Sequence, residues 1–153
     1  MPAAYPCRMS TSRPLWVRTA ARLALGAMLL FAGTSHLTFA RDAFRAQVPT
    51  WVPLSVDFVV LASGVVEIIL GIALIVLYRY RVWVGFIVAA FFIAIFPGNI
   101  SQLVTHTDSF GLNTDTARFI RLLFQPLLVI WALWSSGAWA WLREWRRRRE
   151  SSV

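Results

Sequence analysis

The sequence predicts an all-α integral membrane protein: a four-helix bundle with both ends of the chain in the cytoplasm (N-in/C-in). Three observations support this. Of the 153 residues, 58% are hydrophobic and only 14% are charged, whereas soluble domains carry about 25% charged residues. The chain contains four long apolar stretches, and its arginines are distributed unevenly between the connections that join them. The composition therefore excludes an ordinary soluble domain.

Each of the four apolar stretches is long enough to cross a bilayer. A helix rises about 1.5 Å per residue, so about 20 residues span the hydrocarbon layer. A soluble helical core would also show a polar face with a period of 3.6 residues, which these stretches lack. The predicted spans are residues 16–39, 57–78, 82–104 and 117–141.

The first stretch has a second interpretation, as a cleaved signal peptide. A basic leader precedes an apolar run at 23–33, and small residues follow near Thr38 and Ala40, which is the order found in secretory signals. The leader is long, however, and removing this stretch would leave a three-helix remainder. We therefore favour a retained first helix.

The connection at 40–56 is the longest and is not a plain polar loop. It mixes Phe44, Val48 and Trp51 with two prolines, a composition that fits a segment lying in the membrane interface. The second span then leads into a tight turn at 79–81.

The third stretch contains Pro97, which predicts a bent helix. Its purely apolar part, 82–96, is only about 22 Å long at 1.5 Å per residue, so residues after Pro97 must complete the crossing. Proline also lacks a backbone donor, which leaves the carbonyl of Ile93 free for another partner.

The last stretch begins after a polar loop at 105–114, where Asn113 to Thr116 supply residues that favour a helix start. The resulting organisation has three parts. A cytoplasmic tail covers 1–15, the four-helix domain covers 16–142, and a basic cytoplasmic tail covers 143–153.

The arginines predict the orientation. Eleven of them precede or open the first span, separate the second and third, or follow the fourth, whereas four lie on the other side and are balanced by aspartates. By the positive-inside bias, the arginine-rich side is cytoplasmic. The net charge of +8 is thus a topology signal, and we expect no nucleic-acid partner. The arginine run 146–149 is expected to lie on anionic lipid, at about 1 kcal/mol per arginine.

Polar residues inside the spans mark the candidate site. An ionised group at the bilayer centre costs roughly 2–3 kcal/mol or more, and such groups are usually functional. Every span contributes one or more polar residues on the extracytoplasmic half. We therefore predict a polar pocket there, with Glu67 at its floor. Its candidate residues are His36, Glu67, Asn99, Arg121 and Gln125.

Glu67 is expected to point into the bundle towards the fourth span. Gln125 is its expected nearest polar partner, and Arg121 is expected to reach down from above. Gly64 and Gly71 share the face of Glu67, which either lets another helix approach or leaves room for a ligand.

Each candidate also has a purely structural interpretation. Glu67 could be a protonated carboxyl bonded to Gln125, and His36 could be an interfacial residue. Arg121 could extend to the headgroups, and Asn99 could satisfy backbone groups freed by Pro97. No metal or haem site is expected, because the two histidines, His36 and His106, and the single cysteine, Cys7, form no ligand motif.

Four segments carry a family resemblance: "FAGTSHLTFARDAFRAQVPTWVP", "SGVVEIILGIALI", "FPGNISQLV" and "RLLFQPLLVIWALW". In this order they resemble the DoxX family of small bacterial four-helix membrane proteins, over roughly residues 20–135. The residues that carry the resemblance are Gly33, His36, Pro49, Pro53, Gly64, Glu67, Gly71, Pro97, Asn99, Arg121 and Gln125. Gly33, Gly64, Gly71 and Pro97 are expected to be structural.

The resemblance implies a multi-pass protein of the bacterial inner membrane with a link to redox physiology. The founding relatives are subunits of a thiosulfate:quinone oxidoreductase, and others are associated with oxidative-stress complexes. The present chain has no cysteine pair, so a thiol-redox role of its own is not expected.

Three functions therefore remain open. The first is a redox-associated accessory subunit that binds a quinone- or lipid-like molecule beside a partner enzyme. The second is a small proton-coupled transporter, and the third is a non-catalytic scaffold. The sequence favours an accessory subunit over a self-sufficient enzyme and does not predict the oligomeric state.

Overall fold

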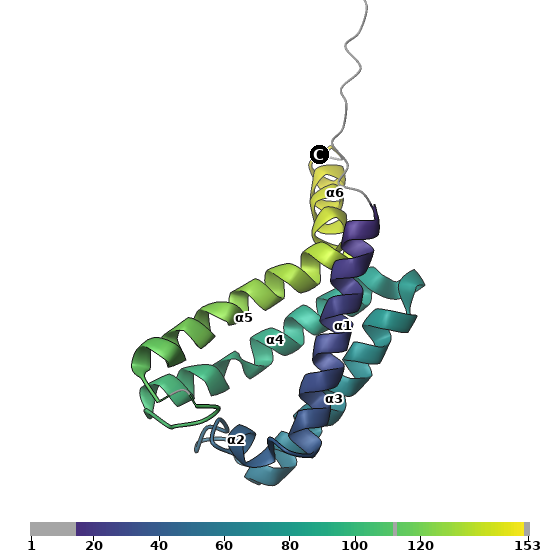
Figure 1. Cartoon of the computed structure of the whole chain (residues 1–153). Helices are drawn as coiled ribbons and strands as arrows, with labels where there is room; N and C mark the ends of the chain where they lie inside the picture. The colour runs from purple at the N-terminus through teal and green to yellow at the C-terminus, as the bar shows by residue number, and fades with distance from the viewer. Residues whose placement is uncertain (1–14, 112, 152–153) are drawn as a thin grey trace, which may run out of the picture.

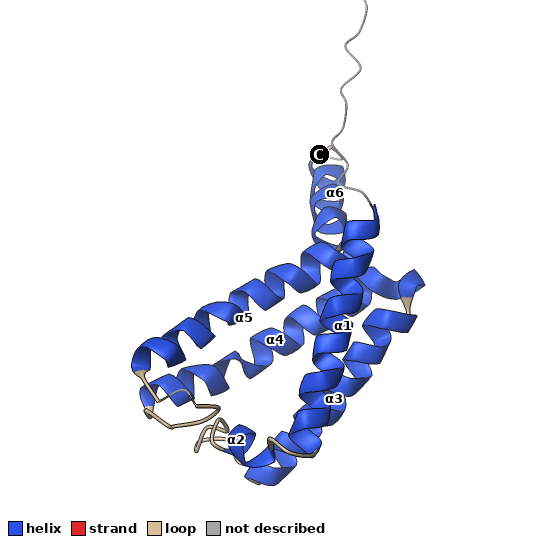
Figure 2. Cartoon of the chain, in the orientation of Figure 1, coloured by secondary structure: helices blue, strands red, loops and turns tan. Residues whose placement is uncertain are grey.

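The structure is a computed structural model that describes residues 15–111 and 113–151, and every regular element in this part of the chain is helical (Figure 2). The all-α prediction is confirmed. The predicted N-terminal tail lies outside the described residues, apart from Leu15. The elements are α1 (Leu15–Leu37), α2 (Arg41–Arg45), α3 (Val56–Val76), the 3₁₀ turn η1 (Tyr78–Tyr80), α4 (Arg81–Val104), α5 (Asp115–Ser136) and α6 (Ala138–Glu150).

Four of the described helices are long and apolar enough to cross a membrane: α1, α3, α4 with the preceding η1, and α5. Their outer surfaces carry large apolar side chains. Phe31 is 67% exposed, Ile69 is 58% exposed and Ile93 is 60% exposed. A monomeric soluble protein rarely exposes so much contiguous apolar surface. The prediction of a multi-pass membrane protein is therefore confirmed.

The four spanning helices form two closely packed pairs, α1 with α3 and α4 with α5 (Figure 1). Glycines bring α1 and α3 together. A Cβ on Gly71 would lie 2.8 Å from the carbonyl oxygen of Gly26, and a Cβ on Gly64 would lie 3.0 Å from that of Gly33. The two glycines are seven residues apart on each helix, so they meet in antiparallel register. Of the two uses that the sequence left open for Gly64 and Gly71, the structure shows close helix approach.

An apolar core fills only one half of the bundle. Leu25, Leu74, Val88 and Ala132 are its most buried members, each 0% exposed. They lie towards the end where α6 begins. At the other end the two helix pairs diverge towards α2 (Figure 1).

Helix α4 runs without interruption through Pro97, so the predicted bend there stays a prediction. A nearby backbone carbonyl does receive an outside donor, because Nε2 of Gln125 donates to the carbonyl oxygen of Phe92 at 2.7 Å. The sequence predicted a free carbonyl at Ile93, because Pro97 lacks the N–H that would bond to it. The carbonyl that accepts the outside donor belongs instead to the preceding residue, Phe92.

The predicted fourth span, 117–141, is wrong at its end. Gly137 has a φ of 87°, in the left-handed region, and it ends α5 at Ser136. Glycine terminates helices in this way because it has no Cβ to clash. The sequence pattern missed the break because the residues that follow are apolar, and α6 then continues as a helix through most of the predicted basic tail.

The start of α5 agrees with the prediction. Thr114 lies in extended conformation, and its hydroxyl accepts a hydrogen bond from the backbone N–H of Ala117. Ser55 caps α3 in the same way, through the N–H of Phe58. The connection at 40–56 contains the short helix α2.

Candidate functional site

A cavity of about 710 Å³ lies between the two helix pairs, in the half of the bundle near α2. Residues of α1, α3, α4 and α5 line it, together with Phe110 and six residues between Phe44 and Val52. Most of the lining is apolar, with Met28, Val60, Ile95 and Leu128 among its members. All five candidate residues from the sequence line this same cavity: His36, Glu67, Asn99, Arg121 and Gln125.

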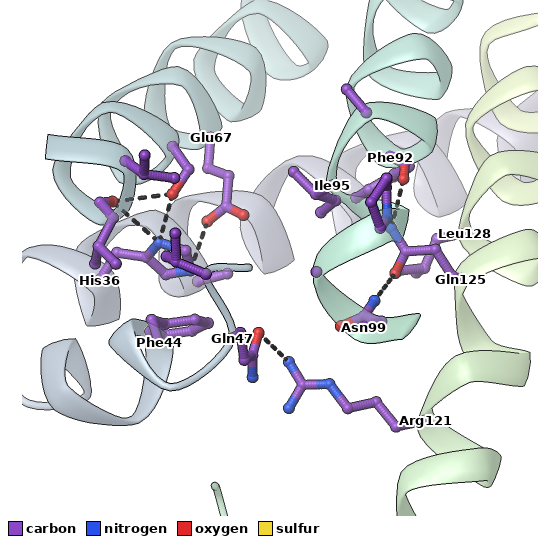
Figure 3. A pocket seen from close by; sticks show the side chains of 18 of the residues that line it. His36, Phe44, Gln47, Glu67, Phe92, Ile95, Asn99, Arg121, Gln125 and Leu128 are labelled. Atoms are coloured by element: carbon purple, nitrogen blue, oxygen red, sulfur yellow. Dashed lines mark hydrogen bonds and ion pairs between the residues drawn. The ribbon is translucent and has the colours of Figure 1, made fainter. Parts of the chain in front are cut away.

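Glu67 is paired with His36 on one wall of the cavity (Figure 3). Its Oε2 lies 3.6 Å from Nε2 of His36, and both residues are buried. The carboxyl faces the bundle interior, as predicted, but its polar partner comes from α1. The reason is the glycine contact between α1 and α3, which brings the α1 backbone against the face of α3 that carries Glu67.

The other nitrogen of His36 fixes the tautomer of the ring. Nδ1 lies 3.3 Å from the carbonyl oxygen of Val60 and 3.0 Å from Oγ of Ser63. Because Ser63 itself donates to the Val60 carbonyl, both groups act as acceptors for Nδ1. We therefore assign a proton to Nδ1. Nε2 then faces Oε2 of Glu67 at 3.6 Å, which is beyond ordinary hydrogen-bond distance.

Gln125 is not the partner of Glu67, contrary to the prediction. Its Oε1 accepts a hydrogen bond from Nδ2 of Asn99 at 2.9 Å, and its Nε2 donates to Phe92. Figure 3 shows this group on the α4–α5 wall, across the cavity from Glu67. Since α4 and α5 are packed together, the two amides find each other within the same helix pair.

Arg121 also has a different partner from the one predicted. Nη2 donates to Oε1 of Gln47 at 3.0 Å, and the guanidinium lies 4.9 Å from the centre of the Phe110 ring. Arg121 thus links α5 to the connection that follows α2, instead of reaching down to Glu67 (Figure 3). The ring of Phe44, a residue of α2, covers His36, with 3.3 Å between ring centres.

Two buried polar atoms of the cavity lining lack hydrogen-bond partners among the described residues. They are Oε2 of Glu67 and Nε2 of Gln47. Buried polar groups in native proteins are nearly always hydrogen-bonded, so an orphaned acceptor and an orphaned donor on one cavity point to a missing ligand or water. The sequence analysis did not single out Gln47, although an amide directly before the mostly apolar run "VPTWVP" was a usable signal.

The cavity has few titratable groups. Among the lining residues these are His36, Glu67 and Arg121. Within 15–111 and 113–151, no group of three or more His, Cys, Asp or Glu residues is placed to hold a metal ion. The arrangement is suited to binding a mostly apolar molecule through a few oxygen atoms.

Comparison with known families places the chain. A family described as a domain of unknown function (DUF8561) matches residues 25–136. The chain belongs to this family. The match begins in α1 and ends at Ser136, the last residue of α5, so it contains the glycine contacts and all five candidate residues, while α6 lies beyond it. No curated protein and no solved structure matches the chain. These findings do not test the resemblance to the DoxX family, which stays a prediction.

Proposed function

We propose that this DUF8561 member is a redox-associated accessory subunit that binds a quinone- or lipid-like molecule between its two helix pairs. One observation carries the proposal: the unpartnered atoms of Glu67 and Gln47 lie on an apolar cavity of about 710 Å³. This volume is within the range of about 300–1,000 Å³ that small-molecule sites occupy.

The chemistry of the lining suits a quinone headgroup. A quinone has two carbonyl oxygens on opposite sides of an apolar ring. The amide N–H of Gln47 is available to donate to one of them, and the Glu67–His36 pair holds a proton that is available to the other. Phe92, Ile95 and Leu128 supply apolar surface for the ring.

A proton-carrying pair fits redox chemistry of this class. Reduction of a quinone to a quinol takes up two electrons and two protons. The chain supplies a candidate proton donor in Glu67, which His36 holds in place. Glu67 accounts for one proton, and the second proton and both electrons are assigned to a partner redox protein, in keeping with the predicted accessory role.

The proposed location is the bacterial inner membrane with both chain ends in the cytoplasm. The arginine asymmetry supports the orientation, and the DoxX resemblance supports the compartment. The cavity then opens in the extracytoplasmic half of the bilayer.

A scaffold function has one observation in its favour. Asn99, Gln125 and the Phe92 carbonyl satisfy one another, as expected of a cluster that only locks α4 against α5. A transporter has less support, because the four spanning helices are continuous, whereas transporter sites are typically built from interrupted helices.

Extraction of the purified protein tests the proposal. The protein is isolated in a mild detergent, and its bound lipids and quinones are identified by mass spectrometry. We expect one quinone- or lipid-like molecule retained per chain in near-stoichiometric amount. A stable, folded bundle that retains none would favour the scaffold.

A further inference from the structure

A second polar site lies at the opposite end of the bundle from the large cavity, where α1 begins and α5 ends. It is a small hollow of about 40 Å³. Three arginines line it, together with Tyr78 and two serines. The arginines come from two helices: Arg18 and Arg22 from α1, and Arg81 from the first turn of α4.

The two arginines of α1 are held in place by the ends of neighbouring helices. Nε and Nη2 of Arg18 donate to the carbonyl oxygen of Trp134, at 3.2 and 2.9 Å. Nη1 of Arg22 donates to the carbonyl oxygen of Leu74. Both acceptors lie in the last turn of a helix, where backbone carbonyls lack intrahelical partners. Each guanidinium keeps further N–H groups that these carbonyls do not use.

Tyr78 brings Arg22 and Arg81 to the same place. The guanidinium carbon of Arg22 lies 5.3 Å from the centre of the Tyr78 ring, and that of Arg81 lies 4.5 Å from it. Both cations thus contact one aromatic ring.

The positive charge of the hollow is not neutralised by the protein. No carboxylate lines it, and within the described residues none of the three arginines forms a salt bridge. Residues 1–14 contain no aspartate or glutamate. Like charges at this spacing repel one another unless an anion joins them.

A buried hydroxyl points to the same conclusion. Ser135 is only 3% exposed, lines the hollow, and its Oγ has no hydrogen-bond partner. A water-sized group needs about 10–15 Å³, so a hollow of this size holds about three such groups. The two non-bridging oxygens of a phosphodiester therefore fit within a hollow of this size.

We propose that Arg18, Arg22, Arg81 and Ser135 bind the phosphate group of a phospholipid headgroup. The position favours a lipid over a free phosphate, because the hollow lies where α1 begins and α5 ends, at the predicted membrane boundary. The exposed rings of Trp16, Tyr80 and Trp83 surround this level, as expected of an interfacial aromatic belt.

The test uses the full-length protein in a neutral detergent and phosphate-free buffer. Thermal unfolding is followed while short-chain phosphatidylglycerol is added, and a parallel series receives inorganic phosphate. Arg81→Gln removes a cation that caps no helix, and Ser135→Ala removes only the hydroxyl. Arg79→Gln is the matched control, because it removes the same charge two residues away and does not line the hollow.

We expect phosphatidylglycerol to raise the Tm of the unsubstituted protein and of Arg79→Gln with the same midpoint concentration. The midpoint should rise about tenfold in Arg81→Gln and several-fold in Ser135→Ala, since hydrogen bonds to charged groups are the strong ones. If inorganic phosphate reproduces this pattern at equal concentration, the site stands and its ligand is free phosphate. An equal rise of the midpoint concentration in Arg79→Gln and Arg81→Gln would overturn the proposal. So would the absence of any increase in Tm with either phosphatidylglycerol or inorganic phosphate.

Discussion

The pairing of Glu67 with His36 shows how a buried carboxyl is accommodated in a membrane span. A lone ionised carboxyl in hydrocarbon is strongly disfavoured. Here the imidazole lies 3.6 Å away, and Ser63 and the Val60 carbonyl hold its other nitrogen. One proton on either of these two side chains leaves the pair without a net charge.

A double-mutant cycle tests this pairing. We expect Glu67→Gln and His36→Gln to be non-additive in the free energy of unfolding, measured by detergent denaturation. The coupling should be about 0.5–2 kcal/mol, the range found for polar pairs between membrane helices. A cycle of Glu67→Gln with Gln125→Leu is the control and should be additive. Coupling to Gln125 with none to His36 would contradict the assignment.

At this scale the sequence predicted which polar residues share the cavity better than it predicted their hydrogen-bond partners. The cost of a polar side chain in hydrocarbon singled out Glu67, Gln125 and Arg121, and all three line one cavity. Depth along the helices suggested that Glu67 meets Gln125. The depth of a residue in the membrane does not determine the rotation of its helix about the helix axis. For α3, the glycine contact with α1 determines that rotation.

Helix packing in this protein depends on glycines spaced seven residues apart. Gly26 and Gly33 of α1 lie against Gly71 and Gly64 of α3. Lipid tails are as apolar as leucine, so membrane helices gain from close backbone contact and not from burial of apolar area alone.

Adding one methyl group at this contact should destabilise the bundle. The new Cβ of Gly71→Ala would lie 2.8 Å from a backbone oxygen of α1, so we expect a loss of about 1–3 kcal/mol in the free energy of unfolding. Ala27→Val adds apolar volume to the exposed face of α1. This substitution should change the free energy of unfolding by less than about 0.5 kcal/mol. Equal effects of the two substitutions would show that the helices do not meet at the glycines.

The end of α5 illustrates what an apolar pattern misses at the scale of an element. Hydropathy continues through Ala138 to Trp141, so the pattern predicted one helix to residue 141. Gly137 nevertheless adopts a left-handed conformation and separates α5 from α6. A single glycine within an apolar run is compatible with both outcomes, because glycines also occur inside membrane helices.

The whole molecule divides its bundle between a packed end and a hollow end. The apolar core lies towards the end where α1 begins and α5 ends, and the cavity of about 710 Å³ occupies the diverging half near α2. Composition and span length were sufficient to predict four crossings, because lipid constrains every residue of a span. The divergence of the two pairs was not predictable, since it depends on tertiary packing between residues far apart in sequence.

Reporter fusions test the orientation of the whole chain. We expect a reporter fused after residue 110, between α4 and α5, to be active on the extracytoplasmic side. A reporter at the C-terminus should be active in the cytoplasm, because the arginine-rich ends stay inside. The reverse pattern would place the cavity in the cytoplasmic half of the bilayer.

Binding of a quinone by a cavity-filling variant tests the central claim most directly. The equilibrium Kd of a short-chain benzoquinone is measured for the unsubstituted protein, for Ala32→Phe and for Ala27→Phe. Ala32 lines the cavity, and Ala27 faces outward from the same helix. Unchanged helical content and Tm serve to confirm that each variant is folded.

If the cavity is the binding site, Ala32→Phe raises the Kd by about 5- to 150-fold, since an obstructing side chain costs about 1–3 kcal/mol. Ala27→Phe then leaves the Kd within about twofold of the unsubstituted protein. Equal Kd values for the two variants, with both proteins folded, would contradict the proposal that a quinone-like molecule binds between the helix pairs.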